Sequence, residues 1–404
     1  MISIEEAQRT ILEYITPLET EKVSIFNGLN RITPEDHIAP WDIPPADNSA
    51  MDGFAFSHAA LGSERLRVTG FLPAGEVGLA PVPAGEAIRI MTGAPLPPGC
   101  DTVVPIEDVQ EEGEWICLTS PVRAGSHVRK RGEDIRSGDI VIPAGTLLRP
   151  QEIGMFSAMG TTALAVYRQA RVAILATGDE LLEPGSTPAP GKIINSNSYS
   201  LAAQVLDAGG NPVLLGIAPD ALEATCDKIK GGLNTDMLII TGGVSVGDRD
   251  FVKEAIEKLG GRVTFWKVNV KPGKPLAFAM LQGTPVFALA GNPVGAMVAF
   301  ELFVRPAILK SMGHRRLFRP MVKALLREPA VNKGERPHLV RGLVSLRDDR
   351  YRVSTTGNQS SGRLSSMIQG NGLLRLAPET SYAAGEEVEV LLLDRGFEMR
   401  KGYK

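Results

Sequence analysis

The stretch that decides the fold is Arg171-Val172-Ala173-Ile174-Leu175-Ala176-Thr177-Gly178-Asp179-Glu180. Its apolar run has the length of a buried strand and ends in a polar turn that contains a glycine. A segment with helical spacing follows, and its apolar side is formed by Leu201, Ala202, Val205 and Leu206. The same order returns three times, at residues 213–217 with 221–231, 237–240 with 252–259, and 285–289 with 293–310. Apolar strands that alternate with helices predict a doubly wound α/β domain over residues 169–316.

The regions on either side of this domain have a different pattern. Residues 1–30 show helical spacing, and short β-type runs separated by turns predict a β-rich lobe at residues 46–139. A return helix near residues 147–158 makes the first part discontinuous, so that residues 1–45 and 140–168 form one linking domain. Short strands resume after Pro320 and predict a small β-barrel-like domain at residues 320–404. Two more strands of the central domain are expected at residues 263–270 and 276–281.

Composition excludes several classes of function. The 404 residues carry a formal net charge of −3 and only 5% aromatic residues, which argues against a dedicated nucleic-acid or membrane-surface binder. No apolar run approaches the roughly 20 residues that span a bilayer, and the first residues lack a signal-peptide pattern. The three cysteines are widely spaced, which predicts free thiols and a cytoplasmic protein.

Three polar glycine loops follow strands of the central domain, at residues 177–180, 241–248 and 290–293. In an open parallel sheet, ligands bind outside the carboxyl ends of the strands, so the loops are expected to meet in one crevice. Gly178, Gly242, Gly243 and Gly291 allow close approach of a ligand to the backbone. Asn292 before Pro293 predicts a helix start whose amides attract an oxyanion. The alternative is that each loop is only a tight turn between a strand and a helix.

Charges of both signs surround this edge. Carboxylates follow the strand ends at Asp179, Glu180, Asp220, Asp248 and Asp250, and such a cluster with a phosphate suits Mg²⁺. The basic residues Lys267, Lys271 and Lys274 are expected on and after the strand at 263–270, with the first two on one face. Lysines placed there can hold phosphates. We therefore predict a site for an anionic, phosphorylated ligand with Mg²⁺, and a solvated, charge-balanced rim is the alternative.

Common catalytic motifs are missing or incomplete. The sequence contains no G-x-G-x-x-G turn, no G-x-x-x-x-G-K-[ST] loop and no H-E-x-x-H helix. Gly243-Val244-Ser245-Val246-Gly247 matches the spacing of a hydrolase nucleophile, but no histidine follows in the domain before His314. On local chemistry alone, Asp52 before Gly53 is a turn residue, and the tract 129–134 is a solvated edge of mixed charge.

Eight short motifs in a fixed order carry a family resemblance. They are Asp-Asn-Ser-Ala-Met-Asp-Gly-Phe-Ala at 47–55, Met-Thr-Gly-Ala-Pro at 91–95, Arg-Gly-Glu-Asp-Ile at 131–135, Ala-Thr-Gly-Asp-Glu-Leu at 176–181, Asn-Ser-Asn at 195–197, Thr-Gly-Gly-Val-Ser-Val-Gly-Asp at 241–248, Lys-Pro-Gly-Lys-Pro at 271–275 and Gly-Asn-Pro-Val at 291–294. Together they resemble the molybdopterin molybdenumtransferase family, which includes the E domain of gephyrin.

The resemblance implies an elongated multidomain protomer of α/β plus β class, whose α/β domain binds molybdopterin and whose first domain dimerises. It implies a homodimer with an active site shared between subunits, and no nucleic-acid or membrane partner. The implied activity is Mg²⁺-dependent insertion of molybdate into adenylylated molybdopterin, with release of AMP and formation of molybdenum cofactor. A molybdopterin adenylyltransferase and molybdoenzyme maturation proteins are the implied partners. Molybdate and tungstate both stay open as the oxyanion.

The resemblance also assigns roles to individual residues. The catalytic positions are Asp52, Thr92, Asp134, Glu180, Asp220 and Asp250, and the last three are the metal ligands. The ligand-holding positions that it implies are Arg129, Lys267, Lys271, Arg341, Ser365 and Ser366. From their place in the predicted crevice and its lysine segment, we add Thr177, Gly178, Asp179, Gly242, Gly243, Ser245, Asp248, Lys274 and Asn292. Ala290 and Gly295 stand where the family usually has proline and serine, so a weaker ligand contact is expected. The main alternative is a molybdopterin-binding scaffold without catalysis, and a nicotinamide-dependent oxidoreductase lacks its fingerprint.

Overall fold

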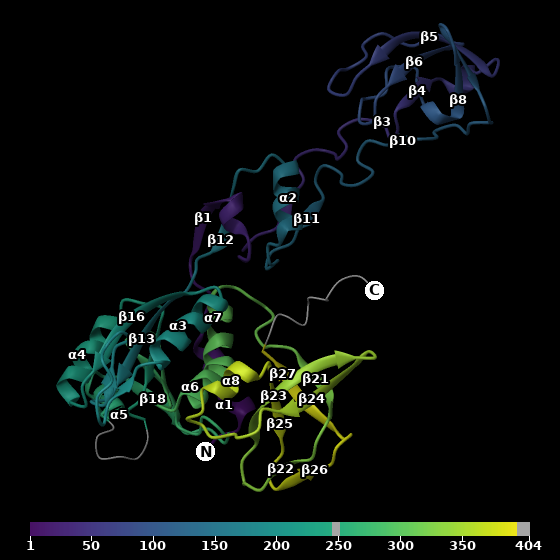
Figure 1. The fold of residues 1–404 in the computed structure, drawn as a ribbon. Coiled ribbons are helices and arrows are strands. Elements are labelled where there is room, and N and C mark those ends of the chain that lie inside the picture. Colours follow the sequence, from purple (N-terminus) through teal and green to yellow (C-terminus); the bar gives the residue numbers. More distant parts are fainter. Residues whose placement is uncertain (245–250, 394–404) are drawn as a thin grey trace. The chain divides into compact units, whose positions relative to one another are not determined.

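A computed structural model describes residues 1–244 and 251–393 of the chain. Two compact units make up the fold (Figure 1). The α/β–barrel unit contains Met1–Val23, Asn30–Pro34 and Ala165–Lys404, and the N-terminal β unit contains Ser24–Leu29 and Glu35–Leu164. The finer division into four domains stays a prediction. No helix of the described ranges is long and apolar enough to cross a membrane.

A six-stranded sheet organises the α/β–barrel unit, in the order β16-β13-β17-β20-β19-β18. Its first four strands are parallel: β16 (Asn211–Ala218), β13 (Arg171–Thr177), β17 (Met237–Thr241) and β20 (Thr284–Leu289). The neighbouring strand β19 (Leu276–Leu281) runs antiparallel to β20 and to β18 (Arg262–Trp266). The doubly wound α/β domain predicted from the apolar strands is thereby confirmed.

Helices cover both faces of this sheet (Figure 1). One face carries α3 (Asn197–Asp207), α6 (Pro293–Ala299), the π-helical turn Phe300–Val304 and α7 (Arg305–Ser311), and the other carries α4 (Leu222–Gly232) and α5 (Val252–Lys258). Strand β13 shows why both faces are filled, because successive side chains of a strand point to opposite sides. Val172 and Ile174 pack on the α3 side, and Ala173 and Leu175 pack on the α4 side.

The first helix, α1 (Ile4–Tyr14), belongs to the same core although it lies at the start of the chain. Ser3 caps it by accepting a hydrogen bond from the Glu6 backbone at 3.0 Å. Its buried residues Ile4, Ala7 and Ile11 pack with residues of α3, α7 and the C-terminal strands. Polar contacts fasten it further: the Gln8 side chain donates to the Leu302 carbonyl, Lys310 donates to the Leu12 carbonyl, and Arg375 pairs with Glu5.

The prediction of helix over residues 1–30 was wrong beyond residue 14. The chain continues after α1 as the strand β1 (Thr20–Ser24), which pairs with β12 (Ala163–Tyr167), and then as a short 3-10 helix (Ile25–Gly28). Pro17 explains the break, because its ring fixes the backbone and it has no N–H for a helical hydrogen bond.

A closed barrel of five strands forms the C-terminal part of the unit, as the sequence predicted. Its order is β21 (Met321–Leu326), β24 (Arg350–Thr355), β23 (His338–Arg347), β25 (Gly372–Leu376) and β27 (Glu387–Leu392). A short helix, α8 (Ser365–Gln369), and a strand pair, β22 (Ala330–Asn332) with β26 (Thr380–Tyr382), accompany it. Inward-facing residues such as Val353 and Val390 make its core.

The N-terminal β unit is β-rich, which confirms that part of the prediction. Its six-stranded sheet has the order β7 (Thr102–Pro105), β4 (Gly53–Phe56), β6 (Glu86–Ile90), β5 (Arg65–Leu72), β9 (Trp115–Leu118) and β8 (Val109–Glu112). Two strand pairs, β2 (His37–Ile38) with β11 (Ile140–Ile142) and β3 (Asn48–Ser49) with β10 (Val128–Arg129), precede α2 (Pro150–Ala158).

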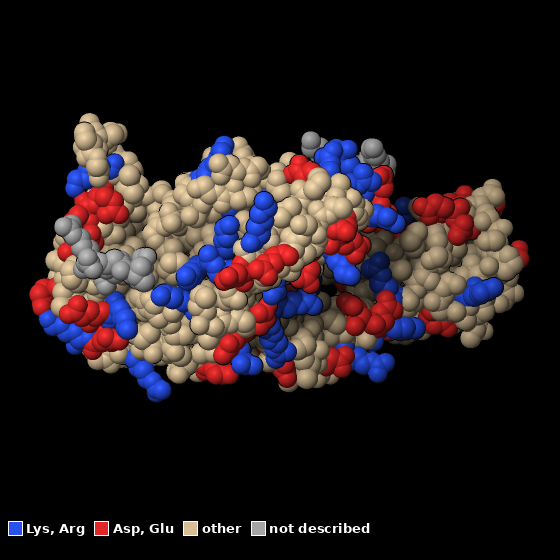
Figure 2. All heavy atoms as spheres, turned by 90° about the horizontal axis from the view of Figure 1, so that it is seen from below, with Lys and Arg blue, Asp and Glu red and all other residues tan. Residues whose placement is uncertain are grey.

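Charged residues are mixed on the surface. Figure 2 shows Lys and Arg interspersed with Asp and Glu over the face that it draws, without one large area of a single sign. This agrees with 43 basic against 46 acidic residues in the sequence.

Candidate active site

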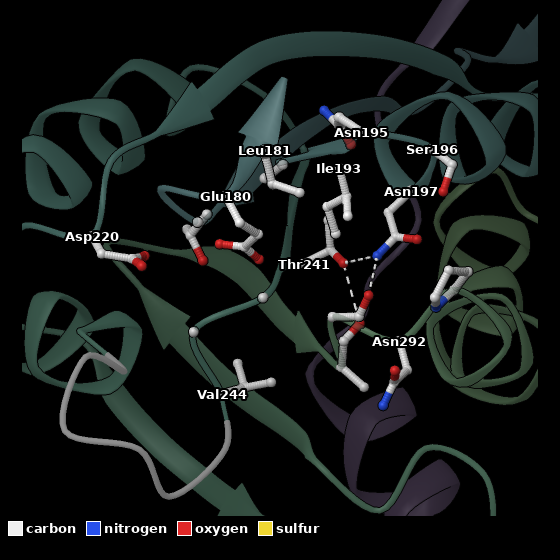
Figure 3. Close-up of a pocket in the computed structure, with 18 of the residues that line it drawn as sticks. Glu180, Leu181, Ile193, Asn195, Ser196, Asn197, Asp220, Thr241, Val244 and Asn292 are labelled. Carbon is white, nitrogen blue, oxygen red and sulfur yellow. Dashed lines mark hydrogen bonds between the residues drawn. The ribbon is translucent and has the colours of Figure 1, made fainter. Parts of the chain in front are cut away.

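A cavity of about 450 Å³ opens at the carboxyl edge of the α/β sheet (Figure 3). The loops that follow β13, β17 and β20 line it together, through Thr177-Gly178, Thr241-Gly242-Gly243 and Ala290-Gly291-Asn292. The three loops predicted to meet do meet. At this edge the connection from β13 leads to β16 on one side, and the connection from the neighbouring strand β17 leads to β18, β19 and β20 on the other side. Such a switch point is where open α/β sheets bind ligands.

Asn197, at the start of α3, connects two of these loops. Its side-chain nitrogen donates to Thr241 Oγ1 and to the Gly291 carbonyl, each at 2.8 Å, and Thr241 Oγ1 donates to the Ala290 carbonyl at 3.2 Å (Figure 3). These partners leave Asn197 Oδ1 as a hydrogen-bond acceptor, and it is buried without a partner among the described residues. Asn197 was not among the predicted site residues. The Asn-Ser-Asn run at 195–197 was the available signal.

Glycines let the loops approach each other closely. Gly242 has a φ of +96°, and a Cβ there would lie 2.5 Å from the Thr177 carbonyl oxygen. Gly178 has a φ of +148°, and a Cβ there would lie 2.5 Å from Glu180 Oε2. Both positions require glycine because side chains are strained at these angles and no space is left for them.

Two of the predicted carboxylates face the cavity. Glu180 and Asp220 line it, whereas Asp179 is bound to the neighbouring loop: its carboxylate accepts from the Asp220 backbone at 3.0 Å. Asp250, Asp248 and Ser245 lie outside the described residues. Within residues 1–244 and 251–393, no group of three or more His, Cys, Asp or Glu could hold a metal. Two carboxylates still fit Mg²⁺, which takes one or two from the protein and completes its shell with phosphate and water.

The placement expected for the lysines was wrong. Strand β18 ends at Trp266, and Lys267 has a φ of +108°, so Lys267 and Lys271 do not share a strand face. The backbone of Lys271 instead joins the barrel strand β23, through hydrogen bonds with Pro337 and Leu339 at 2.9 and 2.7 Å. None of the three lysines lines the cavity, and only Pro275 from this segment does.

A small flap beside the cavity was not recognised in the sequence. It consists of the parallel strands β14 (Leu181–Leu182) and β15 (Ile193–Ile194) and the loop between them. The Ile193 backbone donates to the Glu180 carbonyl at 2.8 Å, and Lys192 Nζ donates to the Asp179 carbonyl at 2.6 Å. The flap is therefore fastened to the loop that carries Asp179 and Glu180.

Four site residues were predicted in the N-terminal β unit, and hydrogen bonds connect the segments of three of them. Asp52 accepts hydrogen bonds from the backbone and hydroxyl of Thr92. These two hydrogen bonds hold the pKa of the Asp52 carboxyl below its usual range. The Asp52 loop is also tied to the segment of Arg129, because Ala50 donates to the His127 carbonyl at 2.8 Å. Asp134 lies on a separate loop, where its backbone donates to the Ile43 carbonyl.

The predicted C-terminal residues centre on a buried arginine. Arg341 on β23 is 1% exposed, and its Nε and Nη2 donate to Ser366 Oγ and the Ser360 carbonyl, each at 3.1 Å. Its Nη1 is buried without a partner in the described ranges, and burial lowers the pKa of Arg341. Ser365 precedes Ser366 on α8 and is exposed. On the same strand, burial together with the positive charges of Lys271 and Arg341 lowers the pKa of His338 to about 4.

Comparisons with known proteins agree along the whole chain. Three family descriptions match in order: "MoeA N-terminal region (domain I and II)" at residues 2–160, "Probable molybdopterin binding domain" at 173–310 and "MoeA C-terminal region (domain IV)" at 323–393. A molybdopterin molybdenumtransferase of Haemophilus influenzae is 34% identical over 398 residues, covering 96% of this chain and 98% of that protein. The chain belongs to the molybdopterin molybdenumtransferase family.

Other relatives agree with this assignment. A molybdopterin molybdenumtransferase of Bacillus subtilis is 34% identical over 404 residues, which cover 97% of this chain and 94% of that protein. The crystal structure of a molybdopterin biosynthesis MoeA protein from Pyrococcus horikoshii OT3 superposes with a TM-score of 0.82 at 30% identity, covering 97% and 100% of the two chains. The cavity lies within the segment that matches the molybdopterin-binding description.

The two departures from the molybdopterin molybdenumtransferase pattern differ in position. Ala290 lines the cavity, whereas Gly295 is buried one turn into α6 and does not. A Cβ on Gly295 would lie 3.4 Å from Ala290 Cβ and 3.5 Å from the Gly273 nitrogen, which is ordinary contact. A serine at this position would therefore pack between Ala290 and the 271–275 segment.

Proposed function

We propose that the protein inserts molybdate into adenylylated molybdopterin, with Mg²⁺-dependent release of AMP, and so forms molybdenum cofactor. Membership of the family makes the protein a transferase of molybdenum cofactor biosynthesis. One observation carries the finer proposal: Glu180 and Asp220 line the same cavity as three glycine loops at the ends of parallel strands. A site with backbone amides and two carboxylates suits a phosphorylated ligand that arrives with a divalent cation.

The carboxylates, the glycines and the buried polar residues of the cavity have different roles in this proposal. Glu180 and Asp220 would hold Mg²⁺, which when bound polarises the phosphate bond that is broken. Gly242 and Gly243 present backbone rather than side chains to the ligand, so that its phosphate can come close to the loop. The buried network of Asn197 and Thr241 keeps these loops in place before the ligand binds. No nucleophile of the protein is needed.

We propose Arg341 and Ser366 as the position that holds molybdate. The guanidinium is buried, and its Nη1 lacks a partner among the described residues. A buried cation without a carboxylate partner favours binding of an anion, because the anion offsets the cost of burying the charge. Lys271 supports the same position because it lies beside His338, which is on the strand that carries Arg341.

Release of AMP tests the proposal directly. Purified protein, adenylylated molybdopterin and molybdate are mixed with Mg²⁺ or with a chelator, and AMP is measured. Glu180→Gln should lower the rate about a hundredfold or more, in the range seen when a group that stabilises transition-state charge is removed. Glu183→Gln is the matched control, since Glu183 is close in sequence but does not line the cavity. A normal rate in Glu180→Gln contradicts the metal assignment.

The second candidate is a molybdopterin-binding scaffold without catalysis. The presence of Glu180 and Asp220 in the cavity speaks against it, because carboxylates weaken binding of an anionic ligand unless a cation joins them. Tight binding of adenylylated molybdopterin without any AMP release, in the presence of Mg²⁺ and molybdate, would favour this candidate.

We also propose a cytoplasmic homodimer in which the Asp52 loop completes the cavity of the partner subunit. The exposed group of Asp52, Thr92 and Arg129 supports a role in binding, since none of them contributes to a core. Asp52→Ala and Glu180→Gln are inactive alone under this proposal, and mixed dimers keep one intact site. Co-expression should restore about one quarter of the wild-type sites. No recovery despite verified subunit exchange contradicts the shared site.

A further inference from the structure

The flap gives the cavity an apolar wall that the proposed chemistry of phosphate and metal does not use. Ile193 and Ile194 are 58% and 38% exposed, and both line the cavity together with Leu181. Single exposed apolar residues are common on protein surfaces. Three on one wall of a concave site are unusual, because each remains in contact with water until something covers it.

Polar groups of the cavity border this wall, and Asn195 and Ser196 directly follow Ile194. Glu180 and Asp220 come from the loops after β13 and β16, and Asn197 and Thr241 come from α3 and β17. In Figure 3, the side chains of Leu181 and Ile193 extend into the cavity between those of Glu180 and Asn197. A mostly apolar wall with a few polar groups at its margin is the usual construction of a site for a flat ring.

A second observation points to a ligand that has hydrogen-bond donors. Asn197 Oδ1 and Thr177 Oγ1 are buried without a partner in the described part of the chain, and both residues line the cavity. Asn197 cannot turn its amide to correct this, because its nitrogen already donates to Thr241 and Gly291. A ring with amino or N–H edges would satisfy such acceptors, and so would the hydroxyl groups of a sugar, which is why a sugar phosphate without a ring is the comparison in the experiment below.

We propose that Leu181, Ile193 and Ile194 form the binding wall for a heteroaromatic ring of the ligand and so determine its specificity. This inference rests on the proposed function, in which the ligand contains two such rings, the adenine and the pterin. Because the Ile193 backbone also donates to the Glu180 carbonyl, a ring on this wall fixes the loop that carries the metal ligand.

Titration calorimetry with three probes tests the wall. The probes are AMP, neopterin and ribose 5-phosphate, which has the sugar phosphate without a ring. Ile193→Ser and Ile194→Ser should each weaken binding of a ring probe about tenfold, and ribose 5-phosphate should bind as it does to the unaltered protein. Ile193→Val should retain the affinity. Leu206→Ser is the control, since Leu206 is 60% exposed on α3 and does not line the cavity.

The outcomes separate this proposal from the proposed function. Weakening of AMP alone assigns the wall to adenine, weakening of neopterin alone assigns it to the pterin, and either result supports the proposal. Unchanged affinity for both rings, or equal weakening of ribose 5-phosphate, overturns it while normal AMP release leaves the proposed function intact. If the unaltered protein binds neither AMP nor neopterin, the proposal of a ring-binding wall is overturned. If the same preparation also releases no AMP, the proposed function is overturned as well.

Discussion

The carboxylate of Asp52 accepts two hydrogen bonds from Thr92, at 2.7 Å from the backbone nitrogen and 2.6 Å from the hydroxyl, across 40 residues of sequence. Both residues are exposed, so the pair does not serve a core. The two hydrogen bonds from Thr92 favour the charged form of Asp52 and so lower the pKa of this carboxyl. The resemblance of the sequence assigned both residues to the site, but did not show that one orients the other.

Thr92→Val should raise the pKa of Asp52 toward the usual carboxyl value. Valine keeps the shape of threonine and removes the hydroxyl donor, which is the larger cause of the shift. Carbon-detected NMR titration of the aspartate carboxyl groups measures this change. Thr119→Val is the control, because Thr119 donates to a backbone carbonyl of the same unit rather than to a carboxylate. An unchanged titration of Asp52 would show that the backbone donor alone sets its pKa.

Gly242→Ala should destabilise the α/β–barrel unit by about 1–3 kcal/mol, the cost of a side chain in a strained backbone conformation. The added Cβ would lie 2.5 Å from the Thr177 carbonyl, so the first and second loops must also separate. Chemical denaturation measures the change in the free energy of unfolding. Gly231→Ala on α4 is the control, since a Cβ there has no heavy atom within 4 Å. It should be neutral or stabilising, and equal loss in both variants would contradict the close approach.

Ser366→Ala should weaken molybdate binding about tenfold, because a hydrogen bond to a charged group contributes about 1.5–3 kcal/mol and Arg341 loses its Nε partner. Thermal shifts over a molybdate titration measure the affinity, and tungstate in parallel samples tests which oxyanion is preferred. Ser381→Ala, an exposed change on β26, is the control. If molybdate stabilised the unaltered protein, Ser366→Ala and Ser381→Ala equally, the assignment of Arg341 and Ser366 to the oxyanion site would be contradicted.

Stability should fall as the pH is lowered from about 6.5 to 4 because of His338. Its pKa is about 4 in the folded protein against an ordinary value of 6.5, so in this range only the unfolded chain takes up the proton. The free energy of unfolding therefore decreases throughout this window and stops responding to His338 below it. Denaturation at several pH values should give a flatter profile for His338→Gln, and the exposed His127→Asn should follow the unaltered protein. Parallel profiles for all three would contradict the shift.

Burial explains which strands could be predicted. Residues 172–177 of β13 are all buried, and a strand covered on both faces appears in the sequence as one apolar run. The predicted extension of β18 to residue 270 was wrong for a related reason. Val268 and Val270 are buried and alternate with polar residues, but they belong to an irregular segment that bridges to Ile2 and His338. Alternation of apolar and polar residues indicates which side chains are buried, but it does not show whether the segment pairs with a neighbouring strand.

The site was predictable as far as topology determines it. Parallel strands bring their carboxyl ends to one edge, so the loops at 177–180 and 290–293 had to meet there. Asn197 could not be found in this way, because its partners lie 44 and 94 residues later in the chain. The lysines were misplaced because a residue in the left-handed region, Lys267, turns the chain where the pattern continued a strand.

The position of α1 affects the order in which the chain can fold during its synthesis. The side chain of Gln8 contacts Leu302, and that of Lys310 contacts Leu12. Nearly 300 further residues must therefore be synthesised before α1 can pack against these partners. At about 5–20 residues per second, a ribosome takes roughly 15–60 s to supply them. Ile4, Ala7 and Ile11 cannot reach these packing partners during that time. The helix made first is thus among the last to dock, and it closes the core only when the barrel strands have emerged.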